Sequence, residues 1–204
     1  MIEFLSGLLN QNVILFYLIN NGMDNNVFDF IMPLITNFGS FIAWAVICGL
    51  LFIFGGEKGK KVALLGLAAL FISNMAVYLL KFIIAEPRPF LTLPHVDLLV
   101  PENEVYSFPS GHTASSFAVA TVIGLKYKLK FKGKKYSLIY PLIAFAGLIG
   151  FSRIYIGVHY PLDVIFGAIF GILSAIMILK YENNYLVDKF SHICLLDKLT
   201  NNSR

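Results

Sequence analysis

Charged side chains are scarce in this sequence: Asp, Glu, Lys and Arg make up only 14% of its 204 residues, whereas 57% are hydrophobic. Soluble domains carry roughly 25% charged residues, so this composition excludes an ordinary soluble protein. The length suits one compact bundle, and no shift in composition marks a second domain. We therefore expect one integral-membrane domain over residues 1–204, folded as an all-α, polytopic bundle of about six transmembrane helices.

Cysteine is also scarce. Cys48 lies in an apolar run and Cys194 in a polar tail, so neither a disulfide framework nor a zinc site is indicated. No cluster of carboxylates suggests a magnesium site, and we expect no metal and no cofactor. The N-terminus lacks a positive segment followed by a cleavage site, so we expect no removable signal peptide.

Apolar runs near the roughly 20 residues needed to span hydrocarbon recur along the chain. The five clear runs are residues 40–54, 62–84, 110–127, 137–156 and 160–181. The first is short and is expected to begin earlier, near Pro33. Residues 2–20 and 27–38 are apolar but carry polar side chains such as Asn12 and Asp29. We interpret this N-terminal region as one further span with a re-entrant or interfacial part.

The basic residues predict which way the spans face. Of the 16 Lys and Arg, 13 fall on one side of the spans: Lys58, Lys60, Lys61, Lys126, Lys128, Lys130, Lys132, Lys134, Lys135, Lys180, Lys189, Lys198 and Arg204. The positive-inside rule makes that side cytoplasmic, including the tail 182–204. The acidic connection 85–109 is then extracytoplasmic, and we expect a plasma-membrane protein.

The other three cations, Lys81, Arg88 and Arg153, fall at or near the outer ends of spans. Cations there are costly unless they are paired or bound to a ligand. Each one alone is equally well explained by a long side chain that reaches the membrane surface. The case for function depends on the residues beside them.

Lys81 is near the end of a predicted helix, and Arg88 stands between Pro87 and Pro89. Each proline disfavours helix in the residue before it, so Arg88 is expected in a stiff turn. A guanidinium and an ammonium together are a common way to hold phosphate.

Ser110, Gly111 and His112 begin another apolar run. Ser110 suits a helix N-cap, and Gly111 lets another group approach the backbone closely. The free N–H groups at such a helix start form an anion site, and His112 lies in that first turn. The alternative is a capped helix start with no ligand.

In the third segment, Pro161 suits the first turn of the last helix, and Asp163 lies in the same turn. From there the Asp163 carboxylate can reach back to His159. A bond from Nδ1–H to that carboxylate leaves Nε2 of His159 free to attack phosphorus. The alternative is a capping Asp beside an interfacial His.

The motifs Lys-x6-Arg-Pro from residue 81, Pro-Ser-Gly-His from residue 109 and Ser-Arg-x5-His-x3-Asp from residue 152 resemble the signature of the type 2 phosphatidic acid phosphatase superfamily. Segments 86–90, 107–110, 150–154 and 157–164 resemble the polyprenyl-diphosphate phosphatases of the bacitracin-resistance type. Gly111 departs from some members of that subgroup, which carry Asp. The resemblance implies a helical membrane phosphatase with its catalytic motifs in residues 81–163.

We expect His159 to attack the terminal phosphorus and form a phosphohistidine, with Asp163 orienting it and His112 protonating the leaving oxygen. The phosphoryl oxygens are expected to be held by Lys81, Arg88, Ser110, Gly111 and Arg153. The expected substrate is a polyprenyl (undecaprenyl-type) diphosphate that keeps its tail in the bilayer, and no nucleic acid partner is expected. The sequence leaves the oligomeric state open.

Three alternatives stay open. The same catalytic groups serve a phosphatase for phosphatidylglycerophosphate or phosphatidic acid. A vanadium haloperoxidase relative would use a similar phosphate site, although the membrane spans argue against it. A lipid transporter or scaffold with a vestigial anion site would be no enzyme at all.

Overall fold

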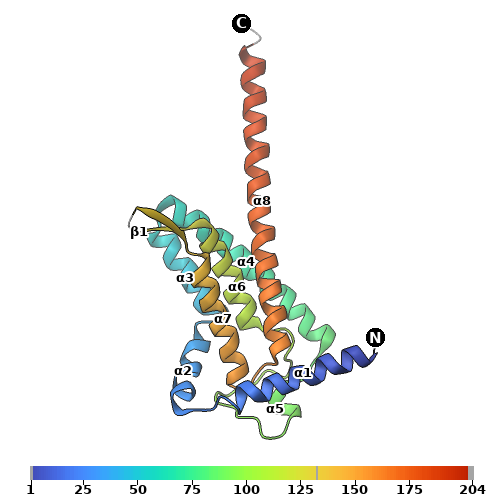
Figure 1. Cartoon of the computed structure of the whole chain (residues 1–204). Coiled ribbons are helices and arrows are strands. Elements are labelled where there is room, and N and C mark those ends of the chain that lie inside the picture. Colours follow the sequence, from blue (N-terminus) through green and yellow to red (C-terminus); the bar gives the residue numbers. More distant parts are fainter. Residues whose placement is uncertain (1, 132, 202–204) are drawn as a thin grey trace.

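The computed structural model describes residues 2–131 and 133–201, and it is mostly helical (Figure 1). In chain order the elements are α1 (Ile2–Asn20), α2 (Asn26–Asn37), α3 (Phe41–Phe54), α4 (Gly56–Ile84), α5 (Pro89–Thr92), α6 (Gly111–Lys126), β1 (Lys128–Phe131), β2 (Lys134–Ser137), α7 (Ile139–Tyr155) and α8 (Pro161–Asn201). Each of the five clear apolar runs forms a helix, as the sequence predicts.

Helix α6 is the centre of the bundle. Most of its 16 residues are buried, and α4, α7 and α8 pack around it (Figure 1). Gly167 and Gly171 of α8 let the two backbones approach closely. A Cβ at Gly171 would lie 2.5 Å from the Ala114 carbonyl oxygen, and one at Gly167 would lie 2.6 Å from that of Ser110. Small residues four apart are a usual way to pack helices tightly in a membrane.

Two of the described helices have the length of membrane spans, and many helices have an apolar surface. Gly56–Ile84 and Pro161–Glu182 are each long and apolar enough to cross a bilayer, and α7 is a shorter apolar helix. Many large apolar side chains on the helices are exposed, among them Ile42, Val46, Leu50, Ile53, Leu64, Phe71, Leu79, Ile165, Ile169, Leu173 and Ile176. Such a surface suits lipid and would be a liability in water.

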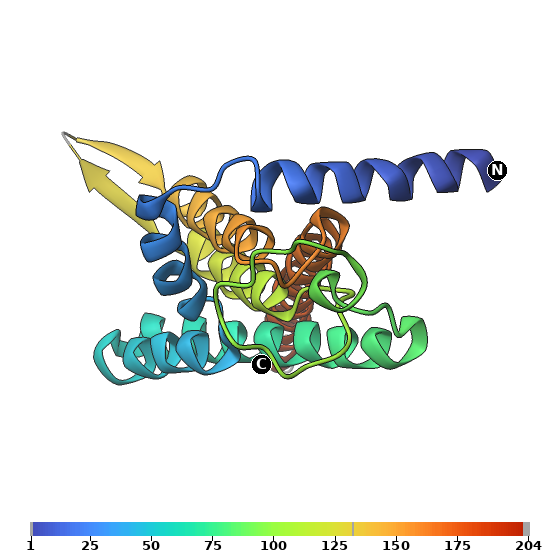
Figure 2. The same cartoon turned by 90° about the horizontal axis from the view of Figure 1, so that it is seen from below.

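The structure of the N-terminal region explains why its apolar runs are short and interrupted by polar residues. Together α2 and α3 also have the length and apolar character of a span, but they are bent by 59° at the break between them. Helix α1 lies across the end of the bundle that carries α5 (Figures 1 and 2). Its buried Asn12 accepts a hydrogen bond from the backbone N of Leu162 (2.9 Å), and Asn20 donates to the Tyr155 carbonyl (2.7 Å). The polar residues of α1 thus tie it to the ends of α7 and α8.

The lysine-rich connection contains a short antiparallel hairpin that the all-α expectation did not include. Strand β1 pairs with β2, with Lys128 opposite Ser137 and Lys130 opposite Lys135. Leu129 and Phe131 alternate with these lysines, which is the period of a strand rather than of a helix. Gly133 takes a positive φ of 76° in the turn, a conformation that glycine adopts at little cost.

The basic end of the bundle is held by Glu182 of α8, which forms ion pairs with Lys61 of α4 (2.8 Å) and Lys126 of α6 (2.6 Å). Lys58 lies over the ring of Tyr127 in the same region. Lys81, Arg88 and Arg153 lie toward the other end of the bundle, where α5 and α1 are found. The bundle therefore has one lysine-rich end and one end that carries the candidate site.

Candidate active site

The first motif ends α4 and turns the chain sharply. The helix stops at Ile84, Ala85 caps it in the left-handed region (φ 49°), and Pro89 begins the short α5. Arg88 is thereby held outside both helices with only 1% of its surface exposed. Its NH1 donates to the Val158 carbonyl (3.2 Å), so the first motif contacts the third directly.

The second motif begins α6 as predicted. Ser110 is the N-cap residue, and its Oγ accepts hydrogen bonds from the backbone N (3.4 Å) and the Oγ1 (2.9 Å) of Thr113. Gly111 and His112 line a cavity at this point. A Cβ at Gly111 would meet Val77 and Asn74 only at ordinary contact distances, so glycine keeps this stretch of backbone open toward the cavity.

The third motif forms a hydrogen-bonded cluster at the start of α8. Nδ1 of His159 lies 3.1 Å from Oδ2 of Asp163, the contact that the spacing predicts. The same Oδ2 accepts from the backbone N of Tyr160 (2.8 Å) and from the hydroxyl of Ser107. Ser107 Oγ also lies 3.2 Å from Nδ1 of His159. With Nδ1 so engaged, Nε2 of His159 is the ring nitrogen left for chemistry.

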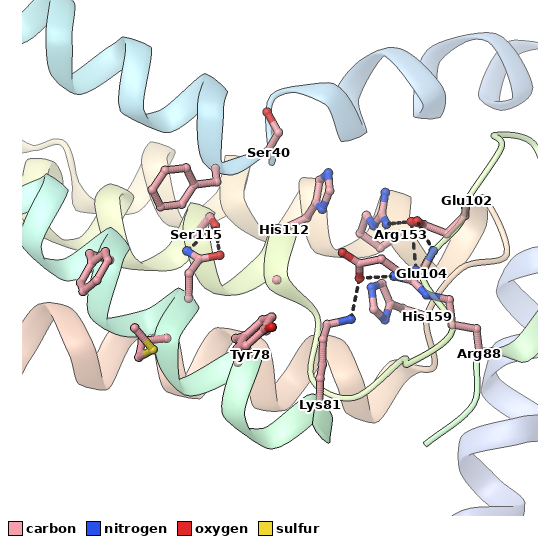
Figure 3. A pocket seen from close by; sticks show the side chains of 16 residues that line it. Ser40, Tyr78, Lys81, Arg88, Glu102, Glu104, His112, Ser115, Arg153 and His159 are labelled. Carbon is pink, nitrogen blue, oxygen red and sulfur yellow. Dashed lines mark hydrogen bonds and ion pairs between the residues drawn. The ribbon is translucent and has the colours of Figure 1, made fainter. Parts of the chain in front are cut away.

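Residues from all three motifs line one cavity of about 610 Å³ (Figure 3). Its polar lining includes Lys81, Arg88, Glu102, Glu104, Gly111, His112, Arg153 and His159. Its apolar lining comes from α3 and α4, through Phe41, Phe71, Met75, Val77 and Tyr78. The cavity thus joins a cationic site to an apolar wall, which suits a headgroup attached to a hydrocarbon tail.

Two glutamates of the loop between α5 and α6 hold the three cations together (Figure 3). Oε2 of Glu102 lies 3.1 Å from NH1 of Arg88 and 3.0 Å from NH2 of Arg153. Oε2 of Glu104 lies 2.8 Å from NH2 of Arg88 and 2.9 Å from Nζ of Lys81. Hydrogen bonds between charged groups of this kind are the strong ones.

Burial and the neighbouring cations keep the His159 imidazole neutral. Burial, followed by the charges of Arg88, Arg153 and Lys81, lowers the pKa of His159 well below its ordinary value of 6.5. Burial also acts to raise the pKa of Glu104, but the hydrogen bond and charge of Lys81 and the charge of Arg88 outweigh it, so that pKa is lowered. At neutral pH the site therefore presents an unprotonated imidazole at His159 and an ionised carboxylate at Glu104.

Seven of the eight predicted site residues lie together as expected: Lys81, Arg88, Gly111, His112, Arg153 and His159 line the cavity, and Asp163 contacts His159. Ser110 is fully buried and caps α6 outside the cavity lining, so its contact with substrate stays a prediction. Ser107, Glu102 and Glu104 also belong to this site, although the motifs alone predict no role for them. All three stand in the connection between the first two motifs, and Ser107 lies in the segment 107–110 that resembles polyprenyl-diphosphate phosphatases.

Comparisons with known proteins agree with this fold. Residues 62–186 match the PAP2 superfamily. The chain is 32% identical over 163 residues to undecaprenyl-diphosphatase BcrC of Bacillus subtilis, covering 78% of this chain and 77% of that protein. The crystal structure of Aquifex aeolicus LpxE has a TM-score of 0.70 and 38% identity, over 84% of this chain and 96% of that one. A transmembrane PAP2-type phosphatidylglycerolphosphate phosphatase from Bacillus subtilis shares the fold, with a TM-score of 0.67, 20% identity and 87% of each chain covered.

An apolar helical bundle that gathers three cations and two histidines at one end defines an integral-membrane phosphatase. The chain belongs to the PAP2 superfamily and is a membrane lipid phosphatase.

Proposed function

We propose that this protein removes the terminal phosphate of a polyprenyl diphosphate of the undecaprenyl type, at the extracytoplasmic face of the plasma membrane. The observation that carries the proposal is the cavity that brings His112, His159 and three cations together beside an apolar wall. Three cations can balance the charge of a diphosphate and of its transition state. The 32% sequence identity to undecaprenyl-diphosphatase BcrC, over most of both chains, supports a diphosphate headgroup.

The proposed reaction has two steps. Nε2 of His159 attacks the terminal phosphorus, the bond to the bridging oxygen breaks, and His112 gives its proton to the departing lipid monophosphate. Water then attacks the phosphohistidine, the P–N bond breaks, inorganic phosphate leaves, and His112 takes the proton from water. The negative charge of the bound substrate favours the protonated form of His112 that the first step needs.

In this mechanism Lys81, Arg88 and Arg153 bind the phosphoryl oxygens, together with the backbone at Gly111 and, by prediction, Ser110. Asp163 acts through His159, which it orients and whose developing positive charge it stabilises. Bulk water is kept from the nucleophile by burial, since His159 is 1% exposed. The reaction as proposed uses no metal.

The test is a panel of lipid substrates, with phosphate release measured in the presence of EDTA. A polyprenyl diphosphate, phosphatidylglycerophosphate, phosphatidic acid and a phosphorylated lipid A cover an anhydride, two glycerolipid esters and a sugar phosphate. We expect the highest kcat/KM for the polyprenyl diphosphate, and no loss of activity with EDTA. A higher kcat/KM for a glycerolipid or for lipid A would contradict the proposed substrate. Inactivation by EDTA would contradict the metal-free mechanism.

A further inference from the structure

The cations proposed to bind phosphate are already engaged by carboxylates. One oxygen of Glu102 is shared between Arg88 and Arg153, and one oxygen of Glu104 is shared between Arg88 and Lys81, at 2.8 to 3.1 Å in each case (Figure 3). An anionic oxygen shared by two cations is the arrangement that a phosphoryl oxygen would take in the same place. The two glutamates therefore hold positions that a substrate phosphate needs.

The two arginines also have N–H donors that the glutamates do not use. NH1 and NH2 of Arg88 each contact a carboxylate, and NH2 of Arg153 contacts one as well. The Nε atoms of Arg88 and Arg153 are buried and have no hydrogen-bond partner within residues 2–131 and 133–201. The site thus has more donors than the two glutamates use, and a phosphate with three terminal oxygens would satisfy them better.

The loop that carries the glutamates is fixed at both ends. Leu99 N donates to the Ile156 carbonyl (3.3 Å), and Arg88 N donates to the Val105 carbonyl (3.1 Å). Between these points Glu102 Oε1 accepts from its neighbours' backbone N atoms in a tight turn. These bonds hold the Glu102 carboxylate in place, whereas the Glu104 carboxylate contacts only Lys81 and Arg88 among the hydrogen bonds of the described residues, so rotation of the Glu104 side chain alone would take it off the cations.

The two side chains differ in how easily they can leave. The Glu104 side chain is 64% exposed, whereas that of Glu102 is 18% exposed. Glu104 is therefore the first to be displaced by an entering phosphate, and it moves into solvent. Glu102 is held more deeply, between two guanidinium groups that are almost fully buried.

We propose that Glu102 and Glu104 are intramolecular competitors that determine which headgroups the site accepts. This inference rests on the proposed function, because it takes the three cations to be the phosphate site. A terminal phosphate brings about two negative charges and three free oxygens, and it displaces the carboxylates. A phosphodiester brings one charge and two free oxygens, no more than a carboxylate, and it does not. The bulk anionic phospholipids of the membrane are thereby kept out of the site without any steric barrier.

The test uses two soluble probes, inorganic phosphate and dimethyl phosphate, with binding followed by 31P NMR titration of purified protein. In Glu104→Gln one competitor loses its charge but keeps its size. We expect inorganic phosphate to bind roughly tenfold more tightly to this variant than to wild type, as for the loss of one close charge pair. Dimethyl phosphate, which should not bind measurably to wild type, should become detectable. Glu102→Gln should act in the same direction.

Glu57→Gln is the matched control, since it removes the same charge at the opposite end of α4, where Glu57 pairs with Lys60. It should leave both affinities unchanged. The exposed position of Glu104 means that its variant is expected to fold normally, and thermal midpoints in the absence of phosphate check this. Unchanged or weaker phosphate binding in folded Glu104→Gln would overturn the inference, because the glutamates would then be supports for the cations.

Binding of these probes needs no turnover, so the two proposals fail separately. If Glu104→Gln binds phosphate more tightly, competition is supported even when the protein hydrolyses no lipid phosphate. The absence of hydrolysis would then contradict the proposed function alone. In an active protein, competition further predicts a lower KM for the lipid diphosphate. It also predicts that phosphatidylglycerol vesicles inhibit Glu104→Gln and not wild type.

Discussion

At the residue scale, the contact between His159 and Asp163 depends on a third side chain from another motif. Ser107 donates its hydroxyl proton to Oδ2 of Asp163 and lies 3.2 Å from Nδ1 of His159. It is fully buried, so water does not replace these contacts if the hydroxyl is lost. Ser107 is therefore a positioning residue that acts through Asp163 and His159.

The first prediction concerns this hydroxyl. Ser107→Ala should lower kcat by about 10- to 100-fold, the equivalent of a hydrogen bond to a charged group worth about 1.5–3 kcal/mol. KM should change little, because Ser107 touches no predicted phosphate ligand. Steady-state kinetics on the purified variant check both values. A loss confined to KM, or a fall in yield of folded protein with normal kcat, would assign Ser107 a purely structural role.

The second prediction concerns pH. A nucleophilic imidazole must be unprotonated, so activity falls on the acid side as His159 takes up a proton. Since burial and the neighbouring cations lower the pKa of His159 well below 6.5, the acid limb of kcat/KM should have its midpoint below pH 6.5. The measurement is a pH profile, with protein integrity checked at each pH. A midpoint at or above 6.5 would show that burial and the cations do not lower the pKa of the nucleophilic imidazole.

The sequence allowed most of the site to be predicted, because local rules placed each part. Proline before and after Arg88 sets the turn, and the spacing of His159 and Asp163 fits a single turn of helix. Glu104 and Ser107 could not be assigned in this way, since their partners lie up to 56 residues away in the chain. Only the folded bundle brings the connection between the first two motifs over the cations.

At the element scale, the close contact between α6 and α8 decides whether the motifs meet, because His112 lies in the first turn of α6 and Asp163 lies in the first turn of α8. The glycines of α8 make that contact possible. A Cβ at Gly171 would lie 2.5 Å from the Ala114 carbonyl oxygen and 2.9 Å from the Ala118 nitrogen, both of them backbone atoms that cannot easily move.

The third prediction follows from this packing. Gly171→Ala should destabilise the protein by about 1–3 kcal/mol, the usual cost of overpacking, and should lower activity by separating the two helices. Gly147→Ala is the matched control, because a Cβ at Gly147 meets no atom within 4 Å. Thermal unfolding in detergent, followed by circular dichroism, measures both. A Gly171→Ala midpoint equal to that of Gly147→Ala would contradict the close approach.

The elements that the sequence did not predict are those whose position depends on tertiary contacts. Residues 2–20 form a helix, as their apolar character suggests, but its position across the bundle depends on the hydrogen bond that Asn12 accepts from Leu162 of α8 and the one that Asn20 donates to Tyr155 of α7. The hairpin of β1 and β2 follows an alternation of lysine with Leu129 and Phe131, but in the sequence the lysines indicate only a cytoplasmic connection. In both cases the sequence shows the local pattern of the element but not the segment against which it packs.

At the scale of the whole molecule, charge separates the two ends of the bundle. Lys61 and Lys126 meet Glu182 at one end, and Lys81, Arg88 and Arg153 line the cavity toward the other. The positive-inside rule then supports an extracytoplasmic site, within reach of lipid diphosphates in the outer leaflet.

The fourth prediction tests this orientation. In a background with Cys48 and Cys194 replaced, Leu98→Cys should react with a membrane-impermeant maleimide in intact cells, because Leu98 is exposed at the site end. Lys135→Cys, in the exposed hairpin, should react only after the cells are opened. The reverse pattern would place the site in the cytoplasm.

The central claim is that His159 carries the phosphoryl group. The direct measurement is rapid quenching of the purified protein with polyprenyl diphosphate labelled in its terminal phosphate, followed by mapping of the labelled peptide. We expect an acid-labile, base-stable phosphohistidine at His159 that forms and decays at rates compatible with turnover and is absent from His159→Ala. Label on another residue, or turnover retained in His159→Ala, would contradict it.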